Sequence, residues 1–274
     1  MTYTKGLDEI SDGVWAYLQP DGGWGWSNAG LVTSHDQSLL IDTLFDLRLT
    51  AEMLDAMRGA TPAAVHIDTV VNTHANGDHC YGNALVADSL IISSAHSAEE
   101  MRALPPATME TLVRSAASLG PTGQFVARIF APFDFEDIPL TLPSKTFAGQ
   151  LDIRVGDRVV SLLEVGPAHT TGDVIAHLPD DDVVFTGDIL FHHGHPIVWT
   201  GPVANWIAAC DRIIELQPRV VVPGHGPLAT VAAVEDLKAY FEFLSHEARL
   251  RFDAGLTPLE AARDIDLGAY AGWG

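Results

Sequence analysis

The sequence predicts a layered α/β fold in which two mixed β-sheets pack on each other and helices cover their outer faces. Short apolar runs that are typical of buried strands alternate with longer stretches of helical spacing. This rhythm occurs twice, over residues 1–100 and 146–274, with a segment of different character between the two runs. The chain has 274 residues, 47% of them apolar, which is enough to bury a sizeable core in a single domain.

The first run begins with three short strands separated by the glycine-rich stretch DGGWGW and by SHDQ. A helix follows at Leu47–Arg58, where the apolar residues fall close to helical spacing. Two further strands and a second helix complete this half of the chain. The strands are expected at Val14–Leu18, Ala29–Thr33, Leu39–Asp42, Asp68–Asn72 and Ser89–Ser93, and the second helix at Ala98–Leu104.

The second run opens with a hairpin, because Gly156-Asp157 is a good two-residue turn between apolar segments. The run ends with a short helix that Thr257 caps, with proline at its first position and glutamate at its third. The other elements are strands at Leu151–Val155, Val159–Val165, Val174–Leu178, Val183–Thr186 and Arg219–Val222, and helices at Asn205–Leu216 and Val231–Arg251.

The segment between the two runs, residues 105–144, is rich in proline and has a helical stretch near Met109–Ser118. We therefore expect one domain over residues 1–274 with an insertion at 105–144. The insertion is either a lid over a functional site or a structural insertion without a role in function.

Charge and composition exclude several classes of function. With 15 basic and 36 acidic residues the formal net charge is −21, so neither nucleic acid nor an anionic membrane is an expected partner. The N-terminus lacks the pattern of a secretory signal, no apolar run is long enough to span a membrane, and two cysteines build no disulfide framework. A cytoplasmic protein is the simplest interpretation, and a mature form whose signal has been removed is the alternative.

Four loops carry histidine or aspartate where an apolar strand ends and a glycine is close by. Loops on a rigid sheet are where sites are usually built. The loops are THANGDH at 73–79, GPAHTTGD at 166–173, FTGD at 185–188 and PGHG at 223–226.

These loops supply the ligands that zinc prefers, imidazole nitrogens and carboxylate oxygens. A single histidine after a strand is most often structural, but four such loops in succession make coincidence a poor explanation. The candidate metal ligands are His74, Asp78, His79, His169, Asp188 and His225.

The order and spacing of these motifs resemble the metal-binding set of the metallo-β-lactamase superfamily, over about residues 14–246. The resemblance implies an αββα sandwich with a site for one or two zinc ions, or another divalent metal, at the sheet edge between the two halves. It implies that His74 and His169 bind the first metal, that Asp78, His79 and His225 bind the second, and that Asp188 bridges both.

One position departs from the family pattern, because Asn76 stands where the motif HxHxDH has its second histidine. An amide oxygen is uncharged and is a weaker zinc ligand than imidazole. We therefore expect weakened binding at the first site and at least one tightly bound metal, while a metal-poor relative that only binds a ligand is an alternative.

The implied activity is hydrolysis of a thioester, ester or lactone. A bound metal lowers the pKa of its water from about 15.7 towards 7, and the resulting hydroxide attacks the carbonyl. Asp78 would orient this water or accept its proton. The alternatives are a β-lactamase-like amide hydrolase and a metal-dependent polyketide cyclase or thioesterase, the latter because THANGDHCYGN and GPVANWIAACDRI are similar to such enzymes.

Contacts with the substrate are expected from two segments. The glycine-rich hairpin resembles the mobile flap of this superfamily, and FHHGHP follows the bridging aspartate. An apolar, aromatic entrance to the site suits a small-molecule acyl substrate, either free or bound to a carrier protein. A homodimer is compatible with the resemblance. The candidate substrate-contacting residues are Trp24, Trp26, Phe191, His192, His193 and His195.

Overall fold

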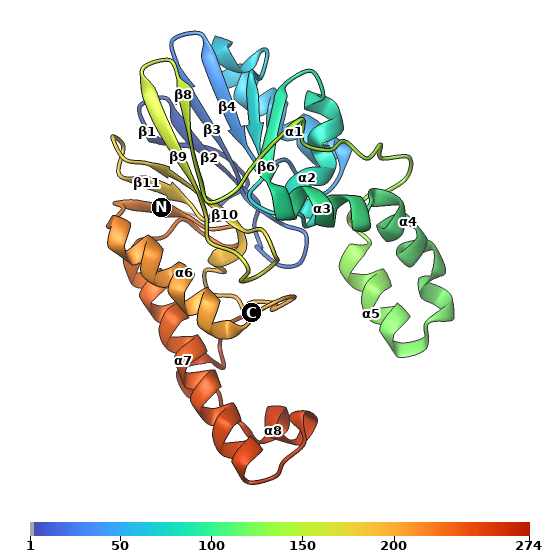
Figure 1. Cartoon of the computed structure of the whole chain (residues 1–274). Helices are drawn as coiled ribbons and strands as arrows, with labels where there is room; N and C mark the ends of the chain where they lie inside the picture. Colours follow the sequence, from blue (N-terminus) through green and yellow to red (C-terminus); the bar gives the residue numbers. More distant parts are fainter. Residues whose placement is uncertain (1–2) are drawn as a thin grey trace.

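The computed structural model describes residues 3–274 and confirms the predicted layered fold, with two mixed sheets between outer helices (Figure 1). The first sheet has the strand order β1-β2-β3-β4-β5-β6-β7. Its first four strands form an antiparallel meander, and β4 to β7 run parallel. The strands are β1 (Gly6–Ser11), β2 (Val14–Leu18), β3 (Ala29–Ser34), β4 (Gln37–Ile41), β5 (Thr69–Val71), β6 (Leu90–Ser94) and β7 (Lys145–Phe147).

The second sheet has the order β12-β11-β10-β9-β8 and is antiparallel except for the β11–β12 pair. Because β11 and β12 run parallel, their carboxyl ends meet at one edge of the sheet, where two of the predicted ligand loops begin. The strands are β8 (Gln150–Val155), β9 (Arg158–Glu164), β10 (Val174–Leu178), β11 (Val183–Phe185) and β12 (Val220–Val222).

The core between the two sheets follows from the alternation of side chains along the strands. In β2, Val14, Ala16 and Leu18 pack against the second sheet, while Trp15 and Tyr17 point to the opposite face, under the helices. Gly30 in β3 faces the ring of Phe185, where a Cβ atom would lie 2.2 Å from Cε1. The sheets therefore pack closely enough to hold loops from both in a fixed relation.

The helices cover the outer faces of the two sheets. Trp206 on α6 is fully buried against the second sheet, and its Nε1 donates a hydrogen bond to the carbonyl oxygen of Ile189 at 2.8 Å. Thr257 and Glu260 form the predicted capping box of the last helix. The helices are α1 (Leu47–Ala60), α2 (Gly77–Cys80), α3 (Ala95–Ala103), α4 (Pro106–Ser115), α5 (Gly120–Phe130), α6 (Val203–Leu216), α7 (Val231–Asp253) and α8 (Pro258–Asp264).

The insertion contains two helices where the sequence predicted one stretch at 109–118. Helix α4 ends at Ser115, and α5, which was not predicted, begins at Gly120 with Pro121 in its first turn. Proline is well accepted in a first helical turn because its missing N–H would have no partner there. The pair α4 and α5 projects from the body of the molecule (Figure 1).

None of the helices within residues 3–274 combines the length and the apolar character that crossing a membrane would require.

Candidate metal centre

All six predicted ligands converge where loops of the two sheets meet, and all six are buried. The loop after β5 supplies His74, and the short helix α2 that follows supplies Asp78 and His79. The second sheet contributes the other three, from the β9–β10 loop, the turn after β11 and the loop after β12. These three residues are His169, Asp188 and His225.

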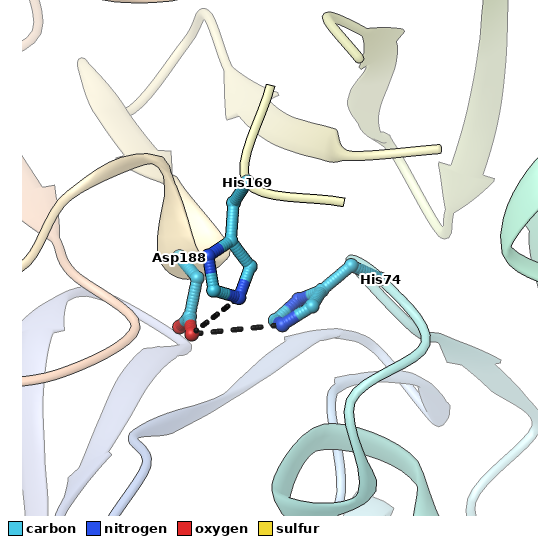
Figure 2. Close-up of side chains that lie close together, drawn as sticks. All are labelled: His74, His169 and Asp188. Carbon is cyan, nitrogen blue, oxygen red and sulfur yellow. Dashed lines mark ion pairs between the residues drawn. The ribbon is translucent and has the colours of Figure 1, made fainter. Parts of the chain in front are cut away.

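The first group consists of His74, His169 and Asp188 (Figure 2). The Oδ2 atom of Asp188 lies 3.3 Å from Nε2 of His169 and 3.6 Å from Nε2 of His74. Two ligand atoms on a tetrahedral zinc ion are about 3.3 Å apart, because each lies about 2.0–2.1 Å from the metal. The spacing of these donor atoms therefore fits a shared metal ion.

The second group consists of Asp78, His79 and His225. Nε2 of His225 lies 3.3 Å from Oδ2 of Asp78, and the Nε2 atoms of His79 and His225 lie 3.1 and 3.5 Å from Oδ1 of Asp188. Asp188 thus presents Oδ2 to the first group and Oδ1 to the second. This is the arrangement expected of a carboxylate that bridges two ions.

Hydrogen bonds on the far side of three imidazoles fix which nitrogen faces the cluster. Nδ1 of His169 lies 2.7 Å from the carbonyl oxygen of Ile197, and Nδ1 of His79 lies 2.8 Å from Oδ2 of Asp42. Both partners only accept hydrogen bonds, so Nδ1 donates and Nε2 is the nitrogen that carries the lone pair in the neutral ring. The hydroxyl of Thr73 donates its proton to Asp42, so it accepts a hydrogen bond from Nδ1 of His74 at 3.0 Å. In the neutral ring of His74, too, Nε2 is therefore the nitrogen with the lone pair.

Asp42 is a buried residue at the end of a predicted strand, and no role in the site was predicted for it. Its carboxylate accepts hydrogen bonds from the backbone N and Oγ1 of Thr73, both at 2.7 Å, and from His79. It adopts a φ of 62°, a left-handed conformation that aspartate tolerates better than most residues. A signal was present in the sequence, because Asp42 also follows an apolar strand directly.

Among residues 3–274, Nδ1 of His225 has no hydrogen-bond partner, and neither do three further atoms of the cluster, namely Nε2 of His74, Nε2 of His79 and Oδ1 of Asp188. Buried polar atoms are nearly always paired, so unpaired ones need an explanation. These three atoms face the two groups, and they are the atom types that bind zinc. The residues therefore fit one or two divalent metal ions.

Burial and mutual charge set the protonation of the cluster. Burial lowers the pKa of His169 to about 3. Burial also disfavours the protonated form of His225, but the neighbouring carboxylates of Asp188 and Asp78 have the larger effect and raise the pKa of His225 to about 9. Burial disfavours the ionised form of Asp188, but the positive charges of His225 and His79 have the larger effect and hold the pKa of Asp188 well below its usual range. The bridging carboxylate is thus ionised, as metal binding requires.

Asn76 lies beside the first group, with its side-chain Oδ1 3.0 Å from Nε2 of His169. Both atoms are acceptors when Nε2 of His169 carries its lone pair, so this contact is a hydrogen bond only when the amide is turned to present its NH₂ group. The amide of Asn76 therefore contacts a ligand of the first group, and its own binding of a metal stays a prediction.

The end of the glycine-rich loop between β2 and β3 ties two ligand loops together. Ser27 Oγ donates to the carbonyl oxygen of Asp78. Asn28 Nδ2 donates to the carbonyl oxygens of Pro223 and Gly226, at 3.0 and 2.8 Å. This loop is therefore anchored beside both Asp78 and His225.

The predicted substrate-contacting aromatic residues have different surroundings. Trp24 is partly exposed, and its ring contacts other aromatic rings. Trp26 packs on Phe133 with ring centroids 4.9 Å apart. Phe191 stacks on the imidazole of His225 at 5.1 Å and an angle of 5°, and so supports a ligand from behind.

The three histidines after Asp188 are used to hold their own loop. Nδ1 of His192 lies 2.9 Å from the carbonyl oxygen of Pro227, and Nδ1 of His195 lies 2.9 Å from the hydroxyl of Tyr240. The carbonyl oxygen of His193 accepts from the backbone N of Gly274 at 3.0 Å. These contacts use one ring nitrogen of His192 and of His195 and only the backbone of His193, so their contact with a substrate stays a prediction.

A family model described as the metallo-beta-lactamase superfamily matches residues 22–225 of the chain. Among curated relatives, a linear primary-alkylsulfatase from Pseudomonas sp. is 26% identical over 237 residues, covering 73% of this chain and 43% of the relative. A hydroxyacylglutathione hydrolase from Rhizobium etli is 29% identical over 107 residues, covering 39% of this chain and 41% of the relative. The chain thus spans less than half the length of these relatives.

Solved structures share the fold. A metallo-beta-lactamase from Pontibacter korlensis superposes with a TM-score of 0.64 and 20% identity, covering 87% of this chain and 99% of that one. A stereoselective inverting sec-alkylsulfatase from Pseudomonas sp. superposes with a TM-score of 0.72 and 17% identity, covering 96% of this chain and 45% of that one.

Proposed function

The chain belongs to the metallo-β-lactamase superfamily, whose members are metal-dependent hydrolases, and from this premise we propose that it hydrolyses a thioester, ester or lactone. The observation that carries the proposal is the bridging position of Asp188 between two groups of donors. Three histidines of these groups are already held in the tautomer that metal binding needs.

Zinc, or another divalent ion, would supply Lewis-acid activation of water and of a carbonyl oxygen at this centre. His74, His169 and Asp188 would hold one ion, with Asn76 Oδ1 beside them. Asp78, His79 and His225, again with Asp188, would hold a second.

The chain's own residues would position the reactants and move the proton. Asp78 is the more open of the two carboxylates, with 11% of its side chain exposed against 5% for Asp188. We assign Asp78 to orient the attacking water and to accept its proton on the carboxylate. Phe191 covers one face of His225 and keeps water from it.

Two features support an acyl substrate of modest charge. The net charge of −21 disfavours a polyanionic substrate. One curated relative is named for hydroxyacylglutathione, in which an acyl group is attached to a thiol. Four further expectations stay predictions. They are turnover of carrier-bound polyketides, cleavage of β-lactam amides, formation of a homodimer and a cytoplasmic location.

A second candidate is hydrolysis of an alkyl sulfate ester. The observation that favours it is the match to two alkylsulfatases, one in sequence and one in structure.

A substrate panel before and after metal removal tests the proposal. We expect the zinc-loaded protein to hydrolyse at least one simple thioester, ester or lactone. Chelation should lower the rate by about 100-fold or more, because a metal contributes several kcal/mol to such a reaction. Added zinc should restore it. Turnover of octyl sulfate alone would favour the second candidate, and hydrolysis that survives complete chelation would contradict both.

The variant Asn76→His tests the weakened first group. We expect about one zinc per chain in the wild type and about two in the variant, because imidazole binds zinc more strongly than an amide oxygen. Elemental analysis of protein purified without added zinc measures this. Two ions in both proteins would show that Asn76 completes the site. No metal in either would contradict the proposed hydrolase and favour a ligand-binding relative.

A further inference from the structure

Three large aromatic side chains from three separate segments meet at the surface although each keeps much of its area exposed. The exposed fractions are 40% for Trp24, 39% for Phe125 and 57% for Trp199. The ring of Trp24 lies 5.6 Å from that of Phe125 and 6.4 Å from that of Trp199, and both pairs are edge-to-face. We call these three residues the aromatic cluster.

Two members of the aromatic cluster stand on loops that contact the loops of the metal-binding donors. The backbone N of Trp199 donates a hydrogen bond to the carbonyl oxygen of His169 at 3.2 Å. On the other side, Gly22 packs so closely on Gly226 that a Cβ atom at Gly22 would lie 2.7 Å from the Gly226 nitrogen. The loops that bear Trp199 and Trp24 therefore each contact a loop that supplies a donor, that of His169 in the first group and that of His225 in the second.

The third member comes from the insertion, whose helix α5 contacts the body of the molecule through two buried residues. Phe130 in α5 is buried, and its ring lies 5.9 Å from that of Phe45. Val126, one helical turn earlier, is buried as well. Since these two residues turn toward the core, Phe125 lies on a different face of α5, against Trp24. The ring of Phe130 also contacts Trp24, at 6.3 Å.

We propose that the aromatic cluster is a binding subsite for an apolar acyl or alkyl chain of the substrate, with the α4–α5 insertion as one of its walls. The inference rests on the proposed function, because it places the reacting group of the same molecule at the metal centre. Exposed aromatic surface gains free energy when an apolar group covers it. An uncharged chain also avoids the repulsion that the acidic protein exerts on anions.

Substrates of graded chain length test the subsite. We would assay N-acetylcysteamine thioesters from acetyl to decanoyl with the wild type, Phe125→Ala and Trp199→Ala. Each methylene that becomes buried contributes up to about fourfold to kcat/KM in the wild type. We expect each variant to lose about 10-fold or more with the decanoyl thioester, mainly through KM, and to keep its rate with the acetyl thioester.

Phe252→Ala is the matched control, since Phe252 in α7 is 70% exposed and outside the aromatic cluster. It should leave the dependence on chain length unchanged. Trp199→Phe keeps an aromatic ring and should restore much of the preference for long chains. An equal loss with acetyl and decanoyl thioesters, or no loss with either, would overturn the inference.

Binding of n-alkyl hydroxamates with two to ten carbons, measured by calorimetry on the zinc-loaded protein, separates this inference from the proposed function. Affinity that rises with chain length in the wild type, and less in Phe125→Ala, supports the subsite even when no ester or thioester is hydrolysed. Affinity that is independent of chain length overturns the subsite even when the acetyl thioester is turned over.

Discussion

Replacing Asp188 with alanine is expected to remove metal from both groups and to lower hydrolysis by about 10³-fold or more. The reason is that one carboxylate serves both groups, with Oδ2 near His74 and His169 and Oδ1 near His79 and His225. Its loss removes a charged ligand from each site at once. Elemental analysis and the rate with the best substrate of the panel measure the two effects.

The matched control is Asp55→Ala, which removes an exposed aspartate that pairs only with Arg58 among the residues described. This variant should keep the metal content and rate of the wild type, since exposed ion pairs contribute little to stability. Two tightly held ions in Asp188→Ala would refute the bridging role and with it the observation on which the proposed function rests.

Replacing Asp42 with alanine is expected to cost about 3 kcal/mol or more of unfolding free energy, because each buried donor left without a partner costs about 1–3 kcal/mol. Three donors lose their acceptor, namely the backbone N and Oγ1 of Thr73 and Nδ1 of His79. Affinity for metal at the second group should fall by about 10- to 100-fold, as is usual when a residue that orients a ligand is removed.

Asp42→Asn separates stability from metal binding. Asparagine tolerates the left-handed conformation at this position, and its oxygen still accepts from the backbone N of Thr73. Its NH₂ group, however, cannot accept the proton of His79 Nδ1. We expect this variant to recover part of the unfolding free energy while metal affinity stays low, as denaturant titration and zinc competition would show. Wild-type affinity in both variants would mean that His79 needs no orienting carboxylate.

The six metal-ligand candidates were predictable from the sequence because each lies at or just beyond the end of an apolar strand. The loop 73–79 follows β5, and 185–188 and 223–226 follow β11 and β12, whose parallel pairing brings their ends together. Local patterns therefore gave both the strands and the positions of the ligands. The resemblance to a known family supplied the grouping of these ligands, which spacing alone does not determine.

Other parts of the molecule had no comparable local signal. The aromatic cluster joins residues 24, 125 and 199, and nothing near any of them in the sequence indicates that their rings meet. Strand β7 has three residues and is defined mainly by its pairing with β6. Helix α5 was not predicted, because the burial of Val126 and Phe130 that stabilises it depends on Phe45 and its neighbours, which are distant in the sequence.

The equal division of the donors between the two sheets has a consequence for folding. His74, Asp78 and His79 come from the first half of the chain, and His169, Asp188 and His225 come from the second. Neither half alone holds a complete site, so an ion binds fully only after the sheets have docked. Binding and docking are then thermodynamically linked, and an ion at about 1,000 times its dissociation constant adds about 4 kcal/mol to the folded state. A bound metal would therefore stabilise the docked arrangement of the two halves in addition to the apolar core between the sheets.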